Sequence, residues 1–72
     1  MSSVKLTARE LEVLALLAHG YTNKEISCSL GIAVRTTNHH VENIYAKIGV
    51  TTRAAAALFA VRHDLVSSDA AS

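Results

Sequence analysis

The stretch TNKEISCSLGIAVRTTNHHVENIYAKIG, residues 22–49, decides the fold. Thr22 and Glu25 stand at the spacing of a capping box, in which the threonine hydroxyl accepts from the backbone N–H three residues on and the glutamate carboxylate accepts from the threonine N–H. Gly31 separates a short apolar pattern from a longer one, and glycine easily adopts the left-handed conformation that ends a helix. We therefore expect two helices joined by a tight turn.

Two further helices are expected on either side of this stretch. Thr7 and Glu10 form another capping box, and apolar residues then recur at helical spacing as far as Gly20. After Gly49, Thr52 is a suitable helix cap before an alanine-rich segment. The sequence thus predicts an all-α, four-helix fold, with helices over about residues 8–19, 23–30, 34–48 and 52–64.

Length and composition limit the classes of protein to consider. A chain of 72 residues, 50% of them apolar, forms one small domain and is too short for a deep catalytic cleft. No uncharged apolar run reaches the length of a membrane-spanning helix, and the single cysteine, Cys28, cannot form an internal disulfide. We expect a soluble, cytoplasmic, non-enzymatic domain over residues 6–66, flexible ends at 1–5 and 67–72, and Cys28 partly buried.

The segment over about residues 23–42 has the features of a helix-turn-helix. Ser27 is small where the two helices would come close, Gly31 permits the turn, and Ile26 and Leu30 are aliphatic residues that would fix the crossing angle. An ordinary helical hairpin has the same features, so this pattern alone leaves both interpretations open.

Helical geometry divides the third helix into two faces. At about 100° per residue, one side carries Val34, Thr37, Val41, Ile44, Tyr45 and Ile48. The opposite side carries Arg35, Asn38, His39, Glu42 and Ala46. Such polar side chains can meet base edges in a DNA major groove, although every surface helix has a polar side that water alone can cover. Residues 20–53 carry four basic and two acidic side chains, whereas the whole chain has a net charge of +1. This mild basic excess permits a polyanionic partner without requiring one.

Motifs at fixed spacing run through nearly the whole chain. They are Leu6-Thr7-x-Arg9-Glu10-x-Glu12-Val13-Leu14, Gly20-x-Thr22-Asn23-Lys24-Glu25-Ile26, Thr36 with His40, Ile44-Tyr45-x-Lys47-Ile48-Gly49-Val50, and Arg53-x-x-Ala56. At these positions the chain resembles the LuxR-type, or GerE-like, DNA-binding domain. The resemblance implies a helix-turn-helix whose second helix enters the major groove of duplex DNA and a final helix that mediates homodimerisation. Members regulate bacterial transcription, often as the output domain of a larger regulator.

The resemblance also implies a set of DNA-contacting residues. The base-facing positions are Asn38, His39 and Glu42, which the helical geometry also places on the outer side. The phosphate-contacting positions are Asn23, Lys24, Arg35, Thr36 and Lys47. An asparagine can pair with adenine through two hydrogen bonds, and a glutamate can accept from cytosine although it repels phosphates.

Several residues depart from the family pattern. Ala33 stands where a serine or threonine cap is common, Thr37 replaces an aliphatic residue, and Asn38 and Glu42 occupy positions that are often basic. These departures favour weak, salt-dependent binding by an isolated monomer. They also keep open an alternative function, a protein-interaction or dimerisation module that retains the helix-turn-helix shape with little DNA affinity.

The alanine-rich fourth helix has two interpretations. Because alanine favours helices, the segment can simply cover the core. It can also bring two copies together through Ala54, Ala57, Leu58 and Val61. A two-fold dimer would place two recognition helices about 34 to 36 Å apart, one turn of DNA, and would prefer a palindromic site.

The sequence gives no reason to expect a metal, a cofactor or a small-molecule ligand. His39 and His40 are adjacent and project about 100° apart on a helix, so they cannot converge on one ion. We expect duplex DNA and a second copy of the chain as partners, and no membrane.

Overall fold

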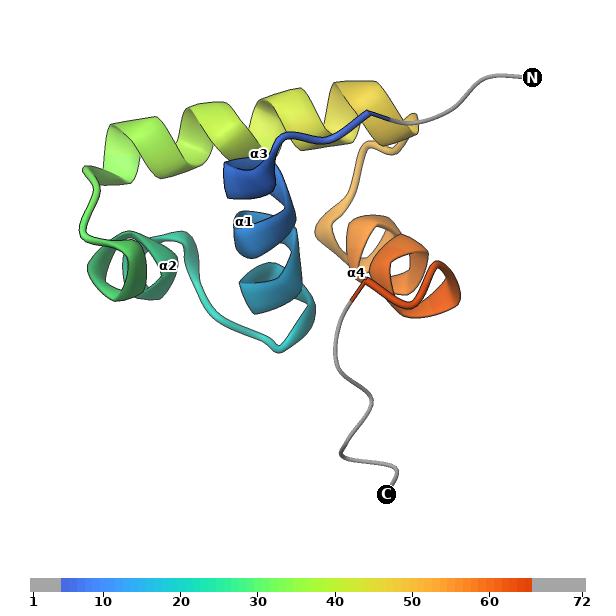
Figure 1. Ribbon diagram of the computed structural model, residues 1–72, viewed down its shortest axis with the longest axis horizontal. Helices are drawn as coiled ribbons and strands as arrows, with labels where there is room; N and C mark the ends of the chain where they lie inside the picture. The colour runs from blue at the N-terminus through green and yellow to red at the C-terminus, as the bar shows by residue number, and fades with distance from the viewer. Residues whose placement is uncertain (1–4, 66–72) are drawn as a thin grey trace.

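The computed structural model describes residues 5–65, which form four helices: α1 (Ala8–Ala18), α2 (Asn23–Leu30), α3 (Val34–Ile48) and α4 (Arg53–Arg62) (Figure 1). The predicted four-helix fold is confirmed, and the described residues contain no strand. The bounds differ from those expected only in α1 and α4, because His19, Thr52 and His63 are cap residues outside the helices. Apart from Lys5, the ends expected to be flexible, 1–5 and 67–72, lie outside the described residues.

Local signals in the sequence start and stop these helices. Both capping boxes are present: Thr7 with Glu10 begins α1, and Thr22 with Glu25 begins α2. Gly31 has φ 69° and ψ 35°, the left-handed conformation that ends α2 and lets the chain turn into α3. These contacts act within a few residues of sequence, which is why they were predictable.

The start of α3 is capped less well. Ala33 is its N-cap residue and makes no side-chain capping hydrogen bond, as expected. Thr37, fully buried at 0% exposure, satisfies its hydroxyl by donating to the Ala33 carbonyl over 3.3 Å. Packing against the other helices, more than local capping, must therefore hold α3 in place.

Helix α1 lies at the centre of the packing and contacts the other three helices. Figure 1 shows α3 running lengthwise along one side, with α2 and α4 on either side of α1. The core consists of Val13, Leu14, Leu17, Ile26, Val41, Ile44, Ala56 and Ala60. Helix α3 thus buries one face against α1 and α2. Val34, assigned to that face from the sequence, is 42% exposed and belongs neither to the core cluster nor to the residues packed against it.

A buried ion pair joins α1 to α3. Glu10 is only 4% exposed, and its Oε1 accepts from the Thr7 backbone N–H at 2.9 Å and from Lys47 Nζ at 2.8 Å. Burial raises the pKa of Glu10, but the hydrogen bonds from Lys47 and Thr7, together with the positive charge of Lys47, outweigh it and hold the pKa below its ordinary value. The capping glutamate of α1 therefore also fixes the far end of α3.

No single helix among residues 5–65 is both long enough and apolar enough to cross a membrane. Only α3 and α4 taken together reach that length and composition, and they are bent by 64°.

The missing cap of α3 gives a first prediction. Ala33→Ser supplies a side-chain oxygen for the free N–H groups of the first turn and is expected to raise the free energy of unfolding by about 1 kcal/mol. Ala46→Ser is the matched control, because it places the same hydroxyl on an exposed site inside α3, where serine is a poorer helix former. Urea unfolding followed by circular dichroism compares the two. Equal stability of A33S and A46S would contradict the assignment of the cap.

The ion pair gives a second prediction. Lys47→Met leaves the Glu10 carboxylate buried without its cation, so at pH 7 the free energy of unfolding should fall by about 1–2 kcal/mol, less than for a fully buried pair because Lys47 is partly exposed. The ionised Glu10 stabilises the wild type fully above the pKa that this carboxyl has in the unfolded chain, and the contribution is lost as the pH falls through the lowered pKa of the folded state.

The difference between wild type and K47M should therefore shrink in acid, where Glu10 is protonated in both proteins. Lys24→Met removes an exposed lysine of α2 and controls for loss of charge. Thermal unfolding from pH 7 down to pH 3 measures both variants. A K47M deficit that does not depend on pH would show that Lys47 stabilises the fold by packing alone.

Candidate nucleic-acid interface

The side of α3 opposite the core is bare. Thr37, Val41 and Ile44 point inward, with exposures of 0%, 6% and 0%. The outer residues Arg35, Thr36, Asn38, His39, Glu42 and Ala46 are all exposed. This division into a buried and an exposed side follows from the helical period, because one face of the 15-residue helix packs on α1 and α2.

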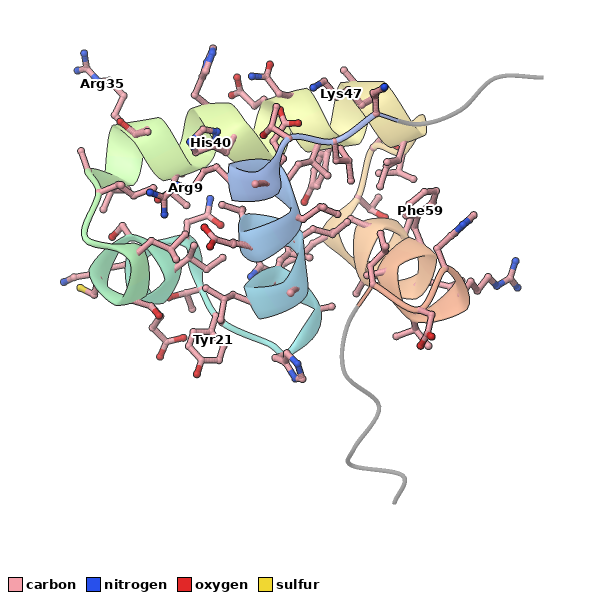
Figure 2. The ribbon with its side chains drawn as sticks, in the orientation of Figure 1. Arg9, Tyr21, Arg35, His40, Lys47 and Phe59 are labelled. Carbon is pink, nitrogen blue, oxygen red and sulfur yellow. The ribbon has the colours of Figure 1, made fainter. Side chains whose placement is uncertain are left out.

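The size of this face suits a DNA groove. A helix of 15 residues is about 22 Å long, and the major groove of B-DNA, about 12 Å wide, admits one α-helix. Figure 2 shows Arg35 projecting from the first turn of α3, away from the body of the domain. The outer face of α3 can therefore approach a duplex without displacing another element.

Electrostatics favour an anion at the first turn of α3. The turn holds no acidic residue, and Ala33 contributes no capping oxygen, so backbone N–H groups and the positive end of the helix dipole are not neutralised there. Arg35 and Thr36 lie exposed in the same turn, and Lys24 is exposed on α2. Glu42 lies further along the outer face and is the single acidic side chain within α3.

The structure brings two of the predicted contact residues together. Asn23, the first residue of α2, donates from Nδ2 to Asn38 Oδ1 on α3 over 2.7 Å. Asn23 Oδ1 in turn accepts from Arg53 Nη1 over 3.2 Å, and Arg53 Nη2 donates to the Tyr21 carbonyl. The resemblance marked Arg53 as part of a motif without indicating this role.

Lys47 is placed differently from the other phosphate candidates. It lies in the last turn of α3, its side chain is 39% exposed, and its ammonium is paired with Glu10. An ammonium has more than one N–H donor, so this pairing leaves donors that can reach solvent or a phosphate. Sequence reasoning missed Glu10 as a buried partner because the capping box explained its spacing completely.

Helix α4 presents apolar side chains on both of its sides. Ala56 and Ala60 are fully buried against the core, whereas Leu58 and Val61 are 51% and 61% exposed. Of the other two predicted dimer residues, Ala54 is exposed and Ala57 is half-buried. Both interpretations of this helix are therefore compatible with its placement.

No group of three or more His, Cys, Asp or Glu side chains in residues 5–65 is placed to hold a metal ion. Cys28 is exposed, so its expected partial burial was wrong. Helix α2 buries the side that carries Ile26 and Ser27, and Cys28 follows at about 100° further round the helix.

Comparison with known proteins agrees with this geometry. The family model for bacterial regulatory proteins of the luxR family matches residues 4–60. The transcriptional regulatory protein LiaR of Bacillus subtilis strain 168 is 48% identical over 62 residues, which are 86% of this chain and 29% of LiaR. The chain thus spans less than a third of the length of this curated relative.

Solved structures show the same fold. The transcription factor GerE superposes with a TM-score of 0.79 at 38% identity, covering 94% of this chain and 100% of GerE. VqmA of Vibrio cholerae, described as a dimeric LuxR-type receptor with a target DNA, superposes with a TM-score of 0.83 at 28% identity, covering 94% of this chain and 32% of VqmA.

The four helices, the bare polar side of α3 and these matches lead to one conclusion. The chain belongs to the luxR family of bacterial regulatory proteins and carries the helix-turn-helix DNA-binding domain of that family.

Proposed function

We propose that this domain binds duplex DNA in a sequence-specific manner by inserting α3 into the major groove, as the output domain of a bacterial transcriptional regulator acting on DNA in the cytoplasm. The observation that carries the proposal is the uncovered stripe of Arg35, Asn38, His39 and Glu42 on a helix whose other side is locked into the core. The activity is binding and requires no catalytic group.

The contact residues divide into two classes. Arg35 and Thr36 at the start of α3, Lys24 and Asn23 at the start of α2, and Lys47 at the end of α3 would hold phosphates and set the register. Asn38, His39 and Glu42 would contact base edges. Because a single domain offers few cations, its affinity should be low and should gain from a second domain on the same duplex. Each phosphate contact adds to the salt dependence of binding, so a pair of domains should depend on salt more steeply than one.

We further propose that two copies associate through the outer side of α4. Leu58 and Val61 are the exposed large apolar side chains of this helix, and Ala54 lies exposed near its start. Small side chains beside large ones let two helices approach closely. VqmA, a structural relative, is described as a dimer. A two-fold pair would place its α3 helices about one DNA turn apart and favour a palindromic site.

The division of contacts gives a third prediction. Arg35→Met and Lys24→Met should weaken binding to all duplexes alike, and each should lower the slope of log K against log salt by about 1, because one phosphate contact is lost. Asn38→Ala should leave the slope unchanged and relax base preference at one position of each half-site. Titrations at several salt concentrations, together with selection of bound duplexes from a randomised pool, measure both effects.

The control for this experiment is Arg62→Met, which removes an exposed cation from α4, a helix without any of the proposed DNA contacts. It is measured on a duplex with a single half-site, so that the proposed dimer contact on α4 does not enter. It should change neither slope nor preference. If no duplex binds the wild type better than random DNA at moderate salt, the alternative function as a protein-interaction module becomes the better account. The acidic Glu42 on the outer face, which repels phosphates, is the residue that favours this alternative.

The dimer gives a fourth prediction. Leu58→Glu places a charge on the outer side of α4, where desolvating it against a second copy is costly. Affinity for a palindromic duplex should fall by about tenfold or more, whereas affinity for a duplex with a single half-site should stay the same. Analytical ultracentrifugation with both duplexes distinguishes one bound copy from two. An equal loss on the two duplexes would place Leu58 outside any dimer contact.

A further inference from the structure

Arg53 makes a connection between helices that do not pack on each other. In the part of the chain that the structure describes, the backbones of α2 and α4 do not contact each other, because each helix packs on α1 and α3 instead. The half-buried side chain of Arg53, at the first position of α4, nevertheless reaches the start of α2, where it donates to Asn23 Oδ1 and to the Tyr21 carbonyl. Arg53 therefore links the helix proposed for dimerisation to the helix-turn-helix.

The chemistry of the guanidinium determines which way the next two side chains face. Arginine donates hydrogen bonds and cannot accept them, so Asn23 must turn its carbonyl Oδ1 toward Arg53. Its Nδ2 then points the other way and donates to Asn38, which must present Oδ1 to receive it. Asn38 consequently turns its own Nδ2 away from Asn23. The directions of the hydrogen bonds from Arg53 to Asn23 and from Asn23 to Asn38 both follow from the guanidinium of Arg53, which can only donate.

We propose that Arg53 is a positioning residue for DNA recognition, which sets the orientation of the Asn38 amide through Asn23 and so selects what Asn38 offers to a base. This inference rests on the proposed function, because it assumes that Asn38 faces bases in the major groove. It assigns a role in specificity to a residue that lies outside the helix-turn-helix.

The orientation has a definite consequence for base choice. The carbonyl of Asn38 is engaged by Asn23, so the Nδ2 donors of Asn38, turned away from Asn23, are the groups left for a base. Guanine offers two acceptors on its major-groove edge, whereas cytosine offers only an amino donor there. Adenine combines an acceptor with a donor and can still pair through two hydrogen bonds, because the engaged carbonyl has a second lone pair. The wild type should therefore accept guanine or adenine and reject cytosine at the position that Asn38 contacts.

The first test needs no DNA. In the wild type the side-chain amide protons of Asn23 are hydrogen-bonded to Asn38, so they should exchange with water about two- to tenfold more slowly than those of Asn38, as expected for one net hydrogen bond. Arg53→Met removes the donors at similar length and should abolish the difference, because both amides are then free to flip. Arg62→Met removes the same charge from the same helix and should preserve it. NMR measurement of side-chain amide exchange in the free domain decides this step.

The second test uses selection of bound duplexes from a randomised pool. Wild type and R62M should disfavour cytosine by about tenfold relative to guanine at one position of each half-site, the size of a single base-edge contact. R53M should lose most of that discrimination at this position and keep the preferences at the others. Arg53→Lys retains a donor-only head group and should recover both the wild-type preference and the slow exchange of Asn23.

Circular dichroism of R53M and R53K confirms that each is folded before the comparison. Unchanged exchange and unchanged base preference in R53M would overturn the inference, and so would an R53K that behaves like R53M in both tests. A wild type without any preferred duplex would instead contradict the proposed function, and the exchange rates would still decide whether Arg53 orients the two amides.

Discussion

Helix α3 can bury only one of its sides, and the arrangement of the domain depends on that constraint. Burial of Thr37, Val41 and Ile44 on the side of α3 that packs on α1 and α2 fixes the rotation of α3 about its own axis. Each large aliphatic side chain removed from water contributes about 1.5–3 kcal/mol, which is more than any single polar contact at the surface of this domain provides. With the rotation fixed in this way, Asn38 and His39 must face outward.

Polar contacts refine what the core establishes. Near the start of α3, Asn38 is tied to Asn23 of α2, and at its end Lys47 is tied to Glu10 of α1. The second contact is the more shielded from water, because Glu10 is buried and its charge is compensated inside the protein, whereas the first is exposed and competes with water. Together they hold both ends of a helix that lacks a side-chain N-cap, so the outer face is presented at a defined angle to the rest of the domain.

Most of the fold was predictable because its signals are local. The Thr7 and Thr22 capping boxes and the turn at Gly31 each act within a few residues, and the period of the helix places Thr37 inward and Asn38 outward. The residues that escaped prediction are those whose partners lie far along the chain, such as Glu10 with Lys47, 37 residues apart, and Arg53 with Asn23, 30 residues apart. Periodicity gives the face of a helix but not how two helices are placed relative to each other. For the same reason the exposure of Val34 was misjudged. The assignment of base and phosphate contacts remains a proposal that rests on the resemblance and on the outer position of these side chains.

The most direct test of the central claim is to map the surface that meets DNA. Backbone amide signals of the domain would be followed by NMR while a duplex is added at low salt. The account predicts that the signals of Arg35, Asn38 and His39 shift most, with those of Asn23 and Lys24, while the signals of Val13 and Leu14 in the core of α1 stay nearly fixed. Signals of Asn38 and His39 that do not move on saturation with duplex would contradict it.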